Sequence, residues 1–317
     1  MAHSEATQTV AYGMSGPAPE ISVCICAFRR PDDLRNLIEL LLKQIPSTPA
    51  YELVIVDNDA ARTSAPVIEE FKNSGPRIHY AVEPVQNISR ARNRSISAAA
   101  GKMIAIIDDD EVPEENWLSE LYKGLIGYRA DAVFGPVYPR FKETPPAWII
   151  DGGFFDYAPL TTGQDVPLDR TRTSNVMIRR SSLPHSTDIF DEKLGLSGGE
   201  DTDLFRRMRE RSAKMIAIQT AVVHENIATH RATMRWLSRR YFRYGSMRID
   251  VYDHKRNSFT YLIVTASTAL LRTLWSFARA IRQAPFSKAR AAGHYLRACY
   301  WVGVLANLAG YMYKEYK

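Results

Sequence analysis

Short apolar runs alternate with segments of helical periodicity over the first two thirds of the chain. Alternating strands and helices predict an α/β fold built on a mostly parallel sheet with helices packed on it. The predicted strands are 21–27, 52–56, 78–82, 103–107, 132–137, 174–178 and 214–223. The predicted helices are 31–42, 64–73, 88–100, 114–127 and 200–212.

Three segments lack this alternation. Residues 1–20 are polar and small, so we expect a disordered tail without the apolar segment of a secretory signal. Residues 138–173 are rich in Pro, Gly and Thr and predict a long irregular segment. Residues 231–317 are basic and apolar and predict helices. The expected domains are therefore 21–230, which carries the sheet, and a helical region over 231–317.

The helical region contains two uncharged runs, 259–271 and 298–313. Both are shorter than the ~20 apolar residues that a membrane-spanning helix needs. Basic residues lie between and beside them, as in helices that rest on a membrane surface. We therefore expect a C-terminal helical membrane-associating region, with two helices packed on the preceding domain as the alternative.

Charge separates the same two parts of the chain. Residues 231–317 carry 16 Lys and Arg against 3 Asp and Glu, whereas residues 1–230 carry 25 against 32. A basic region of this kind suits an anionic membrane, an anionic substrate or nucleic acid. The three cysteines do not suggest a disulfide framework, and Cys24 and Cys26 look like core residues of a strand, although a C-x-C metal or redox pair is an alternative. This cysteine usage fits a reducing cytoplasm.

Polar residues follow three of the predicted strands. They occupy 27–30, 57–59 and the acidic run 108–111. Ligands of parallel sheets bind beyond the carboxyl ends of the strands, so we expect these three segments to share one rim. Carboxylates gathered there repel one another unless a cation joins them. Because Mg²⁺ and Mn²⁺ prefer such ligands, the run favours a metal that neutralises a diphosphate, with a solvated acidic loop as the alternative.

Further candidate chemistry lies outside the acidic run. Asp201 follows Gly198-Gly199 at a predicted helix start and has the chemistry of a general base, although acids also simply favour helix starts. His224 ends a predicted strand and is either a metal ligand or a structural histidine. The basic residues Arg90, Arg92 and Arg94 begin a predicted helix, where they suit a phosphate or form a solvated face.

Four segments together resemble the inverting family 2 glycosyltransferases with the GT-A fold. They read ISVCICAFRRPDDL, ELVIVDND, NISRARNRSISAAAGKMIAIIDDDE and GLSGGEDTDLFRRM, and they cover about residues 20–230. The closer resemblance is to bacterial exopolysaccharide transferases of the succinoglycan type, the ExoM-like group. That group shares VDNDA, the DDDE run, Gly135-Pro136-Val137 and a Pro-Pro-x-Trp at 145–148.

The resemblance implies a role for each matching residue. It implies that Ala27, Phe28 and Arg30 line the nucleoside pocket, that Asp57 contacts uracil, and that Arg92 and Asn93 frame the nucleotide. It further implies that Asp108 lies near the ribose, that Asp110 binds the metal, and that Asp201 is the general base. Asp109 is grouped with the nucleotide-binding positions, with local charge or hydrogen bonding as its only role, and His224 lies near the metal or diphosphate.

The implied reaction transfers one hexose, glucose from UDP-glucose, to a lipid-diphosphate-linked oligosaccharide with Mn²⁺ or Mg²⁺. The implied place is the cytoplasmic, inner face of the cell membrane, with no nucleic acid as partner. Processive relatives carry Gln-x-x-Arg-Trp after the base, but residues 235–240 read RWLSRR, which favours a single addition.

Three alternatives stay open. A nucleotidyltransferase is disfavoured because residues 28–30 lack a Gly-rich phosphate loop. A nucleic-acid-binding protein would use the basic helical region, whose charges are interrupted by long apolar runs. The third is a membrane-bound scaffold without activity. The sequence does not fix the oligomeric state.

Overall fold

The computed structural model describes residues 10–12, 18–156, 158–186, 188–252, 259–311 and 313. The chain divides into two compact units. The first, the sheet unit, comprises 1–138, 158–196 and 200–225. The second, the helical unit, comprises 139–157, 197–199 and 226–317. The helical unit thus includes 139–157 and 197–199, which the sequence analysis predicted to be part of the domain 21–230.

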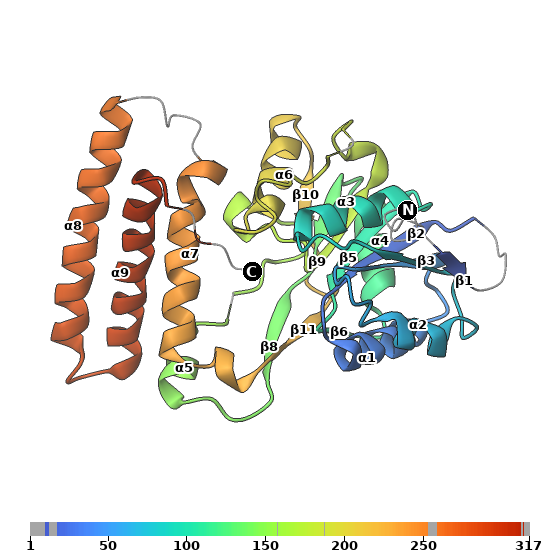
Figure 1. Cartoon of the computed structure of the whole chain (residues 1–317), viewed down its shortest axis with the longest axis horizontal. Helices are drawn as coiled ribbons and strands as arrows, with labels where there is room; N and C mark the ends of the chain where they lie inside the picture. The colour runs from blue at the N-terminus through green and yellow to red at the C-terminus, as the bar shows by residue number, and fades with distance from the viewer. Residues whose placement is uncertain are drawn as a thin grey trace. The chain divides into compact units, whose positions relative to one another are not determined.

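An eight-stranded sheet organises the sheet unit in the order β1-β4-β3-β2-β5-β9-β7-β10 (Figure 1). Neighbours from β4 to β5 run parallel, as do β7 and β10, whereas β1 and β9 are antiparallel to their neighbours. The α/β fold is therefore confirmed, with a mixed sheet. The strands are β1 Val10–Tyr12, β2 Ile21–Ala27, β3 Tyr51–Asp57, β4 Ile78–Val82, β5 Met103–Asp108, β7 Ala132–Phe134, β9 Asn175–Arg179 and β10 Met215–Ala217.

Helices cover both faces of this sheet and create two cores. The helices are α1 Pro31–Leu42, α2 Ala65–Phe71, α3 Ile88–Ala98, α4 Trp117–Gly127 and α6 Glu200–Glu210. One core joins α1, α2 and α4 to residues such as Val23 and Ile25 of β2. The other joins α3 and α6 to Cys24 of the same strand. Alternate residues of β2 therefore serve opposite cores. Burial raises the pKa of the Cys24 thiol to about 12, as expected for a core residue.

Several predicted elements differ in detail. Strand β1 lies within the expected disordered tail and pairs with β4. The run 132–137 contains β7 and the start of β8 Val137–Phe141, and 214–223 contains β10 and the start of β11 Val223–Ile227. A three-stranded sheet has the order β6-β11-β8, with β6 at Glu111–Pro113. Short 3₁₀ turns lie at Leu168–Arg170, Arg180–Ser182 and Thr229–Arg231.

Asn175 fixes the backbone beside β7. Its side chain accepts a hydrogen bond from the Trp117 indole at 2.8 Å and donates to the carbonyls of Pro136 and Ala221. A Cβ on Gly135 would lie 2.0 Å from the Ala221 carbonyl oxygen. The Gly135-Pro136 pair therefore satisfies a packing requirement, because only glycine leaves room for the crossing chain.

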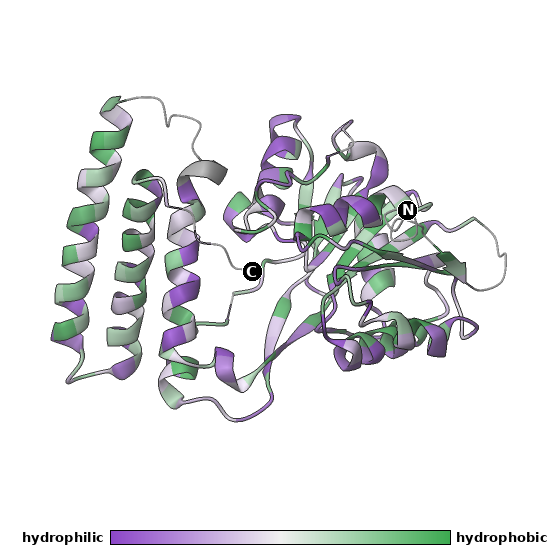
Figure 2. Ribbon diagram, in the orientation of Figure 1, coloured by the Kyte–Doolittle hydropathy of each residue, from purple (hydrophilic) through white to green (hydrophobic). Residues whose placement is uncertain are grey.

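Four helices make up most of the helical unit. They are α5 Ala147–Gly152, α7 Met234–Tyr252, α8 Phe259–Gln283 and α9 Lys288–Leu308. The expected irregular segment 138–173 thus contains most of β8 and all of α5. Hydrophobic positions recur along α8 (Figure 2), which is the one helix among the described residues long and apolar enough to cross a membrane. Length and composition alone are weak evidence for a span.

Two glycines let α7 and α9 cross closely. A Cβ on Gly245 would lie 1.8 Å from the Tyr300 carbonyl oxygen, and one on Gly303 would lie 2.1 Å from that of Phe242. Backbone therefore meets backbone at this crossing, which a side chain on either glycine would force apart.

We expect Gly245→Ala to destabilise the helical unit by about 1–3 kcal/mol, because the added methyl must displace backbone. The measurement is urea unfolding combined with limited proteolysis of α7 and α9. Gly127→Ala is the matched control, since a Cβ there meets nothing within 4 Å. It should be neutral or stabilising by up to about 1 kcal/mol. Equal behaviour of the two variants would contradict the close crossing.

Candidate active site

The ends of β2 and β5 are joined by ion pairs and hydrogen bonds. Asp109, just beyond β5, accepts hydrogen bonds from the Phe28 backbone N–H and the Arg30 guanidinium, both at 3.0 Å. The same Arg30 nitrogen lies 2.7 Å from Asp110 Oδ2. The structure therefore brings together Phe28, Arg30, Asp109 and Asp110, as the strand-end rule predicts.

Residue 29 supports this corner in a strained conformation. Arg29 has a φ of +55°, in the left-handed region that side chains disfavour. Its guanidinium contacts Asp59 at 3.2 Å and lies over the Phe28 ring at 4.9 Å. Such strain persists only where neighbouring contacts enforce it, and it is common at ligand sites.

Arg92 connects the acidic run to the start of α6. Its guanidinium contacts Asp108 Oδ1 at 3.5 Å and forms a short ion pair with Glu200. The side chains of Arg92 and Glu200 are each 8% exposed, whereas that of Asp108 is 39% exposed. Despite burial, the two carboxylates raise the pKa of Arg92, so the guanidinium stays charged. One buried cation thus links β5, α3 and α6.

Asp201 is adjacent to this bridge. Its Oδ1 accepts hydrogen bonds from the backbone N–H and the hydroxyl of Thr202, at 2.6 and 3.3 Å. These bonds hold Oδ1 and orient the carboxylate. Gly198 and Gly199 precede α6 with φ of +88° and +92°, conformations that glycine adopts without strain.

Asp57 has a structural role in the loop after β3. Its carboxylate is fully buried and accepts hydrogen bonds from the backbone N–H groups of Asp59 and Ser64 and from the Tyr80 hydroxyl. Burial raises its pKa, although these donors oppose the shift. A carboxylate engaged in this way shapes the loop, and its contact with uracil, which the resemblance implies, stays a prediction.

Asn93 and Ala27 stabilise elements next to the site. The Asn93 side chain makes two hydrogen bonds with the backbone of Phe190, donating at 2.9 Å and accepting at 2.8 Å. Ala27 is 1% exposed and belongs to the core between the sheet and α1. Both residues hold elements that surround the site, and their implied places beside the nucleotide stay predictions.

His224 lies in the strand that pairs with the residues just after the acidic run. It is inside β11, opposite Val112 in the ladder, and its Nε2 is 3.6 Å from Glu114 Oε1. The tilted ring of Tyr138 packs beside it at 6.1 Å. The expected strand end at His224 is therefore corrected, because β11 continues to Ile227. Its role as a metal ligand stays a prediction that this geometry does not strengthen.

Glu111 and Asp109 are the buried members of the acidic run. Burial and the neighbouring carboxylates raise the pKa of Asp109 to about 7 and that of Glu111 well above its usual range. Glu225, opposite Glu111 in the ladder, contributes to this repulsion. An acidic cluster of this kind is relieved by a cation. Among the described residues, however, no three His, Cys, Asp or Glu side chains already form a metal-binding group.

Sequence reasoning missed two residues of this site, Glu200 and Asp59. Glu200 was interpreted as an acid that merely favours a helix start, whereas it is the buried partner of Arg92. Its spacing from Arg92, 108 positions along the chain, offers no local signal. Asp59 was noted only as part of a polar strand end, and its pairing with Arg29 depends on the parallel register of β2 and β3.

We expect Arg92→Ala to destabilise the sheet unit by about 3–5 kcal/mol, because it leaves the Glu200 carboxylate buried without a counterion. Arg90→Ala is the control, since Arg90 is more exposed and pairs with Glu83 and Glu192. That change should cost about 0–1 kcal/mol in urea unfolding. Pairing Arg92→Met with Glu200→Leu should recover much of the loss. A single Arg92→Ala variant as stable as Arg90→Ala would contradict the buried bridge.

Comparisons with known proteins agree with this geometry. The succinoglycan biosynthesis protein ExoM of Rhizobium meliloti is 30% identical over 302 residues, which cover 92% of this chain and 93% of ExoM. The glycosyltransferase GlyG of Streptococcus pneumoniae is 28% identical over about half of each chain. The fold resembles S. aureus TarS 1-349 in complex with UDP, with a TM-score of 0.54, 14% identity and 93% of each chain covered.

The sheet unit also matches a protein family directly. The model of glycosyl transferase family 2 matches residues 22–184, which include the ends of β2, β3 and β5 and Arg92. With the ExoM relationship over nearly the whole chain, this match decides among the enzyme classes left open by the sequence. The chain is a glycosyltransferase, and it belongs to glycosyl transferase family 2.

Proposed function

We propose that this enzyme transfers one hexose, glucose from UDP-glucose, with inversion to a lipid-diphosphate-linked oligosaccharide. The observation that carries the proposal is the Arg92 bridge, which joins Asp108 at the end of β5 to Glu200 beside Asp201. The bridge puts the candidate for ribose binding and the candidate base on one connected site. The name of the ExoM relative supports exopolysaccharide synthesis, and TarS complexes with UDP and UDP-GlcNAc support a UDP-sugar donor.

The acidic run fits a divalent cation. Asp110 is the proposed ligand, because its carboxylate is less buried than that of Asp109 and shares the Arg30 contact. Burial first, and the neighbouring carboxylates second, raise the pKa values of Asp109 and Glu111, and a nearby cation would favour their charged forms. When bound, Mn²⁺ or Mg²⁺ neutralises the diphosphate as the sugar leaves. The place of His224 in this arrangement rests on the family resemblance alone.

Asp201 is the proposed general base. The acceptor hydroxyl attacks the anomeric carbon from the face opposite the diphosphate, and its proton passes to a carboxylate oxygen of Asp201. A new glycosidic bond forms as the bond to UDP breaks, so UDP departs with the bonding electrons. Because attack and departure occur on opposite faces, one such step inverts the anomeric carbon. Thr202 holds Oδ1 in place and orients the carboxylate.

The helical unit is the proposed membrane-associating part. Its residues after 230 hold most of the basic excess of the chain, and α8 exposes Leu271 and Leu274 by 67% and 59%. Such a surface suits the inner face of the cell membrane, where a lipid-linked acceptor would be presented. No nucleic acid is needed for this reaction.

We expect Asp201→Asn to lower transfer by about 10²–10⁴-fold, because the amide cannot accept the hydroxyl proton. UDP release is measured with membrane acceptor, and UDP-sugar binding by calorimetry should be retained. Asp203→Asn is the matched control on the same helix turn, since Asp203 is paired with Arg206 and Arg207. It should keep activity within about tenfold. Normal turnover by Asp201→Asn would contradict the base assignment.

A further inference from the structure

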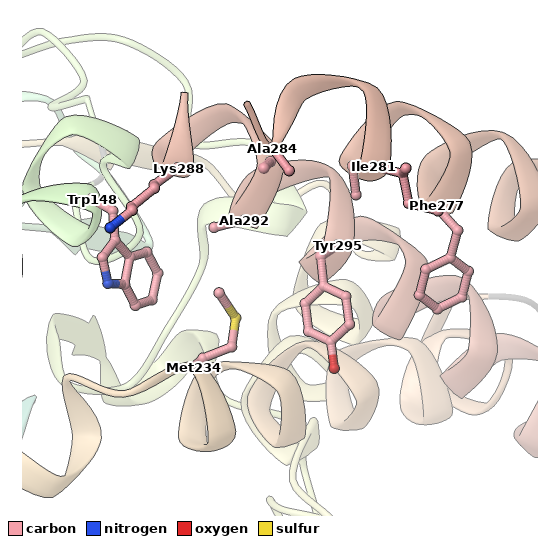
Figure 3. A pocket seen from close by; sticks show the side chains of 10 residues that line it. Trp148, Met234, Phe277, Ile281, Ala284, Lys288, Ala292 and Tyr295 are labelled. Carbon is pink, nitrogen blue, oxygen red and sulfur yellow. The ribbon is translucent and has the colours of Figure 1, made fainter. Parts of the chain in front are cut away.

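The helical unit contains an apolar pocket near the turn that joins α8 to α9. Its volume is about 550 Å³, within the roughly 300–1,000 Å³ range of small-molecule sites. Trp148 of α5 and Met234 of α7 contribute to its walls, and α8 and α9 supply the rest (Figure 3). The residues from α8, the turn after it and α9 are Phe277, Ala280, Ile281, Ala284, Lys288, Ala291, Ala292 and Tyr295.

The pocket exists because small residues face one another across the helical hairpin. The lining positions recur at intervals of three and four along each helix, so each set occupies one face. At one end the rings of Phe277 and Tyr295 meet at 6.1 Å. Between there and the turn, four lining positions besides Ile281 are alanines, which leave space between the helices unfilled: Ala280, Ala284, Ala291 and Ala292.

One end of the pocket is positively charged. Lys288 is the only charged side chain among the described residues that line it. Figure 3 shows Lys288 and Trp148 at the left of the pocket and Phe277 at the right. Lys288 begins α9, where the helix dipole also favours an anion. The pocket thus combines an apolar body with a single cationic end.

The surface around the pocket has the same character. No Asp or Glu occurs in residues 254–314, a stretch with nine Lys and Arg that include Arg282, Lys288 and Arg290. Ile281 and Phe286 are exposed by 75% and 77% beside the pocket. The exposed apolar side chains continue along α8 at 263, 264, 270, 271 and 274. An apolar stripe edged by cations is complementary to an anionic lipid surface.

The position of Arg272 favours a helix that lies on the membrane. Arg272 is near the middle of α8 and its guanidinium lies 4.8 Å from the Trp301 ring centroid. An arginine at the centre of a spanning helix costs about 2.5–3.5 kcal/mol or more, whereas at the interface it meets lipid phosphates. Arg279 lies two turns further along the same face of α8, with its guanidinium 4.2 Å from the ring centroid of Trp275 in the same helix.

We propose that this pocket binds one hydrocarbon chain of an anionic phospholipid, whose phosphate contacts Lys288. Apolar walls accept the chain, the lysine fixes the headgroup, and the exposed stripe of α8 rests on the surrounding membrane. The pocket is then a lipid-recognition site that holds the helical unit at the bilayer. The inference rests on the proposed function only in taking the membrane as the place where the acceptor is presented.

The test uses the full chain and vesicles that contain a photoreactive phosphatidylglycerol or phosphatidylcholine, with crosslinks mapped by mass spectrometry. We expect phosphatidylglycerol crosslinks on α5, α8 and α9 at the pocket residues. Ala284→Trp, which fills the pocket, should lower them at least tenfold. Ala278→Trp is the control, because Ala278 is exposed on α8 and does not line the pocket. That variant should retain the crosslinks.

A second pair of variants separates the lysine contact from general attraction. Lys288→Glu and Arg290→Glu change the net charge equally and lie in the same turn of α9. Each of these reversals removes a cation and adds an anion, a change of two charges that weakens binding to an anionic bilayer roughly 30-fold wherever it lies on the surface. If the lipid phosphate contacts Lys288 at the pocket, Lys288→Glu weakens membrane binding more than Arg290→Glu does. Equal losses for both variants would overturn the site and leave only a basic surface.

Two other outcomes also overturn the proposal. Crosslinks that stay unchanged in Ala284→Trp show that the chain does not enter the pocket. Crosslinks obtained with a photoreactive isoprenyl diphosphate, but with neither phospholipid, identify an acceptor lipid in its place. Calorimetry of UDP binding on the same samples tests the sheet unit independently. Intact UDP binding without lipid crosslinks therefore rejects this inference alone, and lost UDP binding with intact crosslinks rejects the proposed function alone.

Discussion

The buried charge of Arg92 is the constraint on which the site depends. A guanidinium that is 8% exposed needs carboxylates close by, and it obtains them from the end of β5 and the start of α6. Residues far apart in sequence are thereby held together, including Asp108 and the neighbour of Asp201. Hydrophobic replacements of buried ion pairs often stabilise a fold equally well. In this chain the ion pairs hold Asp108 and Glu200 on either side of one guanidinium, beside the proposed base Asp201.

The second determinant is the corner made by β2 and β5. Arg30 and the Phe28 N–H fix Asp109, while Asp110 remains the less buried carboxylate. The loop after β3 is fixed by Asp57 and by Asn58, whose amide donates to the carbonyls of Glu83 and Val85. The polar residues at the strand ends thus fall into two groups. One group holds the loops in place, and the other faces the region where substrate is expected.

The sheet and its polar rim were predictable from sequence because they follow local rules. Apolar runs marked β2, β4 and β5 almost to the residue, and the rule for parallel strand ends placed 28–30 near 108–111. The sequence did not show which of these polar residues hold the loops and which face the region where substrate is expected. Asp57 has the same residue type as Asp108, and only tertiary hydrogen bonds bury it. Likewise, the sequence of β9 is typical of any strand. Its antiparallel direction relative to β5 depends on the long connection that precedes it. The pocket in the helical unit arises from alanines that face one another only after α8 and α9 pair.

We propose that the end of this sheet binds uridine diphosphate together with a metal ion at Asp110. Thermal unfolding with UDP, CDP or GDP, each with and without Mn²⁺, tests it most directly. At about 100 times the dissociation constant, binding stabilises by about 2.7 kcal/mol, or roughly 5–10 °C for a unit of this size. We expect this rise in the unfolding temperature for UDP with Mn²⁺, and we expect Asp110→Asn to abolish it. A shift that is equal without metal, equal for all three nucleotides or unchanged in Asp110→Asn would contradict it.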